Sequence, residues 1–118
     1  MIKQTTVTVG GDEYLISSFP STRGLGIMKR LAKLIGPAIS EMSKENATVA
    51  SALACLFENM ESTGFEQLML DLTSGVTKNN MALNFDMEFS GEYEKLYQII
   101  EHVVTLNYGS VFQMLGTK

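Results

Sequence analysis

The chain offers few side chains that could carry out a reaction. Its single histidine is His102 and its single cysteine is Cys55. A nucleophilic thiol needs partial exposure and a nearby base or positive charge, whereas Cys55 lies inside the apolar run Leu53–Phe57. His102 has Glu101 beside it but no second imidazole with which to share a metal. We therefore interpret both residues as structural, because no nucleophile–base pair or metal pair can be assembled from them.

Two other patterns resemble chemical motifs but lack their required parts. The segment Arg23–Lys29 contains two glycines and a lysine, as phosphate-binding loops do, but it has no buried strand before it and no Lys-Ser/Thr pair. We interpret its glycines as letting a helix start close to the preceding extended segment. Four carboxylates lie close together without the spacing of a calcium loop: Asp86, Glu88, Glu92 and Glu94. No catalytic residue, cofactor or metal is predicted, and carboxylate-only catalysis is the one enzymatic option that residue counts leave open.

Length and composition are those of one soluble domain spanning residues 1–118. With 118 residues, 45% of them hydrophobic, the chain can bury a core without metals or disulfides. A single cysteine fits a reducing compartment. The N-terminus lacks a signal-peptide core, and the longest apolar run, Val49–Phe57, is too short to span a bilayer. We expect a cytoplasmic protein with no membrane partner.

The net charge of −4 is distributed unevenly along the chain. Residues 1–44 carry six basic and three acidic side chains, whereas residues 45–118 carry three basic and ten acidic ones. Four of the basic residues fall on one predicted helix: Arg23, Lys29, Arg30 and Lys33. Domains that bind nucleic acid are usually basic overall. We therefore interpret this cluster as a solvated helix face, with an acidic protein partner as the second option.

A β-hairpin is predicted over residues 5–17. The glycines of Gly10-Gly11-Asp12 supply the positive φ angles of a tight turn, with either Gly10-Gly11 or Gly11-Asp12 at the tip. Either choice places four large apolar side chains on one face: Val7, Val9, Tyr14 and Ile16. Because isolated two-stranded hairpins are only marginally stable, this face must pack on another element.

Helical periodicity dominates residues 21–75. An apolar stripe predicts a first helix from Ser21 to Ile35. Gly36-Pro37 should end it, because proline lacks the amide donor of the helix. Further helices are expected over three ranges: 37–42, 48–61 and 63–75.

Residues 81–89 show a period-two alternation. Smaller or polar residues occupy the even positions. The odd positions carry large apolar side chains, namely Met81, Leu83, Phe85, Met87 and Phe89. This pattern predicts either a third strand for the hairpin or an extended arm. The chain also contains eight methionines, whose flexible side chains suit both cores and adaptable binding surfaces. Because an apolar arm with an unpaired edge can dock another chain, we predict partner binding here.

The C-terminal segment 91–115 is predicted to be helical. One helix should begin near Gly91 and end at Asn107, which tolerates the left-handed conformation found at helix ends. A short second helix carrying Phe112 should follow. The predicted fold is therefore α+β and mainly α, with a small N-terminal hairpin packed on a bundle of four to five helices.

The order of these parts resembles that of the small tail assembly chaperones of tailed bacteriophages. The resemblance spans most of the chain and rests on Val7–Tyr14 and on later aromatic and small residues: Phe89, Gly91, Tyr93, Leu96, Asn107, Tyr108 and Phe112. It implies a non-enzymatic protein that binds the tape-measure protein and tail-tube subunits in the bacterial cytoplasm and is absent from the mature virion. It also implies that a longer form can arise by translational frameshifting.

Partner-binding residues are predicted in the arm and near the C-terminus: Met81, Leu83, Phe85, Met87, Phe89 and Phe112. Self-association is a further option, and nucleic acid is not expected as a partner. Two alternative functions stay open, namely a structural virion component (a connector or tail-completion protein) and an inhibitor of a host defence protein. Mimicry of nucleic acid by such an inhibitor is disfavoured, because the acidic residues are interleaved with apolar ones.

Overall fold

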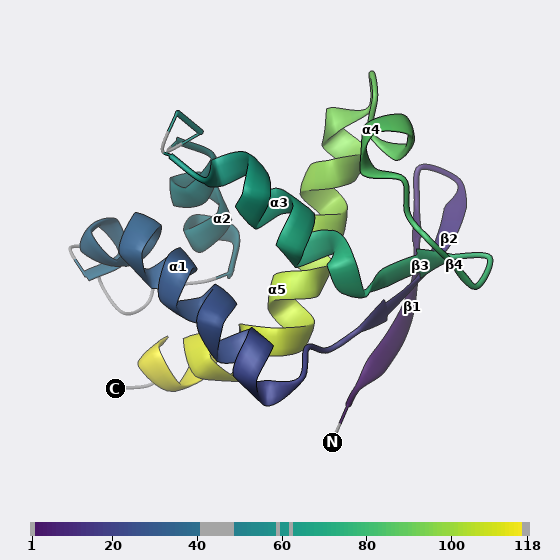
Figure 1. The fold of residues 1–118 in the computed structure, drawn as a ribbon. Helices are drawn as coiled ribbons and strands as arrows, with labels where there is room; N and C mark the ends of the chain where they lie inside the picture. The colour runs from purple at the N-terminus through teal and green to yellow at the C-terminus, as the bar shows by residue number, and fades with distance from the viewer. Residues whose placement is uncertain (1, 41–48, 59, 62, 117–118) are drawn as a thin grey trace.

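A computed structural model describes residues 2–40, 49–58, 60, 61 and 63–116, with the backbone alone for 37–40 and 112–116. A small sheet lies to one side of the helices (Figure 1). In chain order the elements are β1 (Gln4–Val9), β2 (Asp12–Ser17), α1 (Ser21–Ser40), α2 (Val49–Glu58), α3 (Phe65–Leu72), the 3-10 helix η2 (Thr73–Gly75), β3 (Val76–Lys78), β4 (Met81–Ala82), α4 (Phe85–Glu88) and α5 (Tyr93–Gly116). The predicted fold class is confirmed: the protein is α+β and mainly helical, with an antiparallel hairpin at its N-terminus.

The β1–β2 hairpin forms as predicted, with Gly10 and Gly11 at the tip of its turn. Their φ angles of 60° and 85° are both positive, as a two-residue type I′ turn requires. The register starts with Val9 opposite Asp12 beside the turn and continues along both strands. The four residues predicted to share one face all lie in or against the core, three of them buried and Val7 partly buried.

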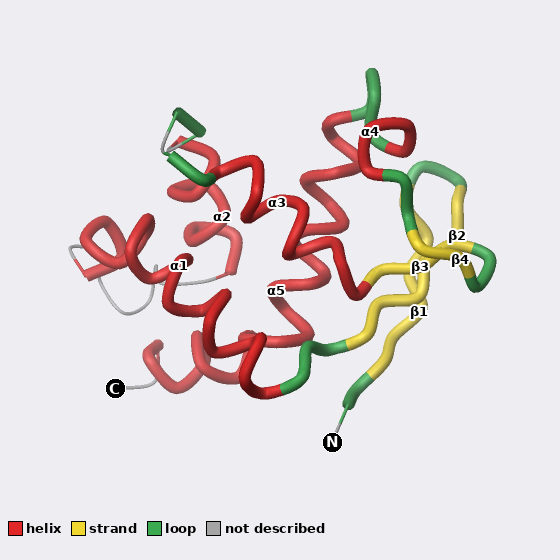
Figure 2. Tube along the Cα trace, in the orientation of Figure 1, coloured by secondary structure: helices red, strands yellow, loops and turns green. Residues whose placement is uncertain are grey.

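Two further strands complete an antiparallel sheet of order β1-β2-β3-β4, shown in yellow in Figure 2. Strand β3 comes from the segment between the predicted helix over 63–75 and the alternating residues 81–89, and its Val76 pairs with Ile16 of β2. Asn79 and Asn80 then take positive φ angles of 55° and 64° in the turn to β4. Asparagine tolerates this conformation better than most residues, so the chain can reverse here without glycine.

The strand predicted over residues 81–89 is wrong in its extent. Only Met81–Ala82 form a strand, and Phe85–Glu88 form helix α4. The Asn84 side chain accepts a hydrogen bond from the amide of Met87 at 3.3 Å, as a residue capping a helix N-terminus does. This local cap favours a helical turn over the extended backbone that the alternation indicated.

The predicted break at Gly36-Pro37 is also wrong, because α1 continues through both residues to Ser40. Proline removes one amide donor from the helix ladder. Pro37 lies close to the C-terminal end of α1, where little of the helix follows the missing bond. Of the short helix predicted over 37–42, residues 41 and 42 lie outside the described part of the chain.

Helix α5 does not end at Asn107 as predicted. The Asn107 side-chain nitrogen donates to the carbonyl oxygen of Val103, and its side-chain oxygen accepts from the amide of Phe19, both at 2.9 Å. The Tyr108 hydroxyl donates to the carbonyl oxygen of Gly24 at 2.8 Å. Asn107 therefore fastens the connection between β2 and α1 to α5, and Tyr108 fastens the first turn of α1 to it, instead of ending the helix.

Helix α5 is central to the hydrophobic core. It contacts α2, α3, η2, β1 and β2, and in Figure 1 it runs through the molecule with the sheet on its right and α1 and α2 on its left. Ile99 and Ile100 are fully buried at 0% exposure, and Val103 and Val104 are nearly so. Each neighbouring element therefore loses apolar contacts if this helix is disturbed.

Truncation of α5 in the core should destabilise the whole protein. We expect Ile100→Ala to lower the free energy of unfolding by about 2–5 kcal/mol, because it removes buried methyl groups and leaves a cavity. The exposed Val111 lies on the same helix, and Val111→Ala should change this free energy by less than about 1 kcal/mol. Urea denaturation followed by circular dichroism measures both, and equal effects of the two substitutions would contradict a central role for α5.

Candidate binding site

An apolar groove of about 490 Å³ opens between α2, α3, α4 and α5. Almost all of its lining atoms are apolar. It is lined by residues from these helices and from the connection between α2 and α3: Phe57, Met60, Phe65, Glu66, Met69, Phe85, Tyr93, Leu96 and Tyr97. The groove therefore lies where the end of α2 and the beginning of α3 meet α4 and the beginning of α5.

Aromatic rings hold the walls of this groove against one another. The Phe57 ring lies 5.7 Å from that of Phe65 in an edge-to-face arrangement and 5.0 Å from that of Tyr97. Phe85 packs edge-to-face on the buried Phe89 at 5.2 Å. Such pairs stabilise beyond the area that they bury, so the groove has a defined shape before any partner arrives.

Two residues of the groove present large apolar side chains to solvent. Met60 is 55% exposed, and Tyr93, the first residue of α5, is also exposed. Contiguous exposed apolar surface on a small protein usually marks a site of interaction. The groove therefore offers apolar surface against which another molecule can pack.

A cluster of charged side chains holds α4 in place beside the groove. The Tyr14 hydroxyl donates to Glu88, and Lys78 Nζ lies 3.2 Å from the same carboxylate. Lys95 Nζ lies 2.8 Å from Asp12 and 3.6 Å from Glu88. The cluster therefore joins the hairpin, β3, α4 and α5, and it fixes the helical turn that carries Phe85.

Lys95 is nearly buried, at 5% exposure, and its side chain passes over the hairpin turn. A Cβ atom on Gly10 would lie 2.9 Å from Lys95 Cε. Glycine is thus required there twice, once for the positive φ of the turn and once for this close approach. Gly10 therefore leaves the space that the Lys95 side chain occupies over the turn.

The cluster stays charged at neutral pH. The hydrogen bond from the Tyr14 hydroxyl, with the nearby charges of Lys78 and Lys95, lowers the pKa of Glu88 below its usual 4.5, although burial opposes this. The hydrogen bond between Lys95 and Asp12 raises the pKa of the lysine and lowers the pKa of the carboxyl. A general acid or base works best with a pKa near the working pH, so these groups are suited to holding structure and not to proton transfer.

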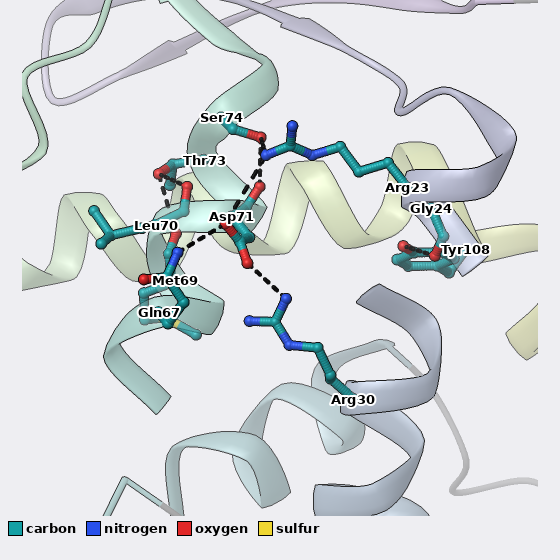
Figure 3. Close-up of polar contacts among 10 residues, drawn as sticks. All are labelled: Arg23, Gly24, Arg30, Gln67, Met69, Leu70, Asp71, Thr73, Ser74 and Tyr108. Atoms are coloured by element: carbon teal, nitrogen blue, oxygen red, sulfur yellow. Dashed lines mark hydrogen bonds and ion pairs between the residues drawn. The ribbon is translucent and has the colours of Figure 1, made fainter. Parts of the chain in front are cut away.

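The predicted basic face of α1 is partly used inside the protein. Asp71 of α3 lies 2.6 Å from an Arg30 nitrogen and 3.9 Å from an Arg23 nitrogen, as Figure 3 shows. Arg23 also donates to the Ser74 hydroxyl at 2.8 Å. Two of the four cations therefore tie α1 to α3 and η2, and the two lysines remain exposed.

The structure separates the predicted partner-binding residues. Met81 and Met87 are exposed. Leu83 and Phe85 are partly buried against the core, and Phe89 is buried within it. Because residues 85–88 are helical, these side chains do not form the single face that the alternation predicted.

Phe85 is the predicted residue that lines the groove, while the side chain of Phe112 lies outside the described part of the chain. The sequence alone did not identify Phe57, Phe65 and Tyr93 as the lining of a groove. Position is the signal that could have found them, because each lies at or next to the end of its helix. At a helix end an apolar stripe can extend beyond the neighbour that covers it.

The described residues contain little that suggests a reactive centre. Cys55 is buried and His102 is partly buried. Across residues 2–40, 49–58 and the described part of 60–116, His, Cys, Asp and Glu side chains do not gather in a group that could hold a metal ion. In the same residues, none of the helices has both the length and the hydrophobicity to cross a bilayer.

Comparison with known proteins identifies one family. A family model described as "Phage tail assembly chaperone protein, TAC" matches residues 10–116. Neither a curated protein nor a solved structure matches the chain significantly. The matched range includes every residue that lines the groove.

The charged cluster should make stability depend on pH. Because the folded-state pKa of Glu88 is depressed, its ionised form stabilises the protein above the unfolded pKa near 4.5 and loses this effect as pH falls through the folded value. We expect Glu88→Gln to cost about 1–3 kcal/mol at pH 7 and progressively less as pH falls below 4.5. Urea denaturation at several pH values measures this, with the exposed Glu94→Gln as control. A cost that does not change with pH would contradict this role.

Proposed function

The chain belongs to the phage tail assembly chaperone family, and we propose that it acts without catalysis by binding the tape-measure protein, tail-tube subunits or both during tail assembly. The observation that carries this proposal is the apolar groove between α2, α3, α4 and α5. In this proposal the groove covers apolar segments of tail proteins until those segments reach their final packing. Self-association of the apolar segments is then suppressed.

The composition of the groove suits transient binding to more than one sequence. Met60 contributes an exposed, flexible and polarizable side chain that adapts to different shapes, and the buried Met69 lies behind it in the lining. Phe57, Phe65 and Tyr97 contribute rings that are held by contacts with one another. Fixed aromatic rings beside the adaptable Met60 side chain favour broad recognition over a single fixed partner.

The residues predicted from the sequence extend this proposed surface. Phe85 forms part of the groove wall, and the exposed Met87 lies on the same helical turn. The full set that we propose as partner-binding or as support for that surface is Met81, Leu83, Phe85, Met87, Phe89 and Phe112. Since Phe89 is buried beneath Phe85, it would act by holding Phe85 in position.

The groove can be tested with one substitution and a matched control. We expect Met60→Asp to weaken association with a tape-measure fragment or a tail-tube subunit about tenfold or more, since a charge must lose water on binding. Leu25 on α1 is 57% exposed against 55% for Met60, and it does not line the groove. Leu25→Asp should therefore leave association unchanged. Co-expression with each tail protein, followed by affinity pull-down, measures the difference.

Both variants should keep the circular dichroism spectrum and thermal midpoint of the unmodified protein. Equal weakening by the two substitutions would place the contact outside the groove. If the unmodified protein associates with neither the tape-measure protein nor the tail-tube subunit, the proposed function itself is wrong.

A chaperone that works during assembly should not remain in the product. We expect the chain to be found in the host cytoplasm during infection and to be absent from purified virions. Quantitative mass spectrometry of purified particles, scaled to the copy number of the tail-tube protein, measures this. Stoichiometric retention in particles would favour a connector or tail-completion protein instead.

A further inference from the structure

The segments that form the apolar groove carry many exposed carboxylates. Glu66 lines it directly. Other exposed carboxylates are sequence neighbours of lining residues on α2, on the α2–α3 connection, on α4 and at the start of α5: Glu58, Glu61, Asp86, Glu92 and Glu94. Among the described residues, ion pairing to this set is limited to Glu92, which lies 3.7 Å from Lys95. The negative charge around the groove is therefore available to a partner.

The same segments carry almost no positive charge that could neutralise these carboxylates. Residues 57–72 contain neither lysine nor arginine, and residues 85–97 contain only Lys95. Lys95 is nearly buried and held by Asp12 at 2.8 Å. A partner that enters the groove thus meets an apolar floor on segments whose net charge is negative.

The lining also limits the backbone conformation of a partner. An extended peptide needs hydrogen-bond partners for its amides and carbonyls, and the groove offers almost no polar atoms. A helix satisfies these groups internally and can bury one apolar stripe while its flanks stay at the border. The groove therefore favours a helix over a strand.

We propose that the groove binds an amphipathic helix of a partner protein whose apolar stripe is flanked by lysine or arginine residues. This inference rests on the proposed function and names the chemistry of its partner. The apolar stripe enters the groove between Phe57, Phe65, Phe85 and Tyr97, and the flanking cations pair with Glu66 and with exposed carboxylates of the neighbouring segments. Contacts of this kind chiefly set specificity and the rate of encounter.

Two synthetic peptides test the charge of the partner directly. Both are helices of about 18 residues with the same leucine stripe, one flanked by lysines and the other by glutamates. We expect the lysine peptide to bind the full chain about tenfold more tightly at low ionic strength, and the difference to shrink as salt screens the charges. Fluorescence anisotropy of labelled peptides measures both affinities.

Two charge reversals distinguish an effect of the carboxylate that lines the groove from an effect of the protein's net charge. Glu66→Lys should weaken the lysine peptide about threefold or more and strengthen the glutamate peptide, because an exposed ion pair is worth up to about 1 kcal/mol. Glu13→Lys changes the net charge equally, but Glu13 is exposed on β2 and does not line the groove. It should leave the ratio of the two affinities unchanged.

The possible results separate this inference from the proposed function. Equal affinity for the two peptides, or equal effects of the two reversals, would overturn the basic-helix inference while leaving the groove as a binding site. Failure of both peptides to bind would overturn the groove itself. Self-association of the chain that Met60→Asp abolishes, measured by analytical ultracentrifugation, would identify a second copy as the occupant and overturn a separate partner.

Discussion

Burial of helix α5 holds the other elements in place, because the sheet, α2, α3 and η2 all pack against it. Its central residues, Ile99 and Ile100, are fully enclosed. Toward its C-terminal half, Asn107 binds the connection between β2 and α1, and Tyr108 binds the first turn of α1. The hairpin, which would be marginal alone, is stable because its apolar face covers this helix.

The two environments beside the beginning of α5 are different in kind. On one side, Lys95 enters a cluster with Asp12 and Glu88, where every charge faces an opposite charge. On the other side, Leu96 and Tyr97 line an apolar groove. Consecutive residues on a helix point in different directions, so one turn of α5 serves both. The ionic side holds α4, and α4 supplies Phe85 to the apolar side.

In this protein of the tail assembly chaperone family, the arrangement sets an apolar groove beside a cluster of paired charges. The carboxylates and amines of the cluster remain charged at neutral pH and are engaged with one another. Part of the groove could be anticipated from the chain, since Phe85 belongs to the alternating segment that indicated partner binding. The rest could not, because Phe57, Phe65 and Tyr97 have the spacing of ordinary core residues. Their meeting at one edge depends on where α2 ends and where α3 and α5 begin.

The sequence by itself determined the features that are set within a few residues. The Gly10-Gly11 turn defined the hairpin and its inward face, and apolar spacing identified the helices, because both patterns depend on local backbone geometry. Only the tertiary structure decided the pairing of β3 with β2, the continuation of α5 through Asn107, and the helical turn that begins at Phe85. These outcomes depend on hydrogen bonds and packing between residues far apart in the chain, or on a local cap that competes with a longer pattern. The groove belongs to this second class, because its walls come from four helices and exist only once α5 has brought them together.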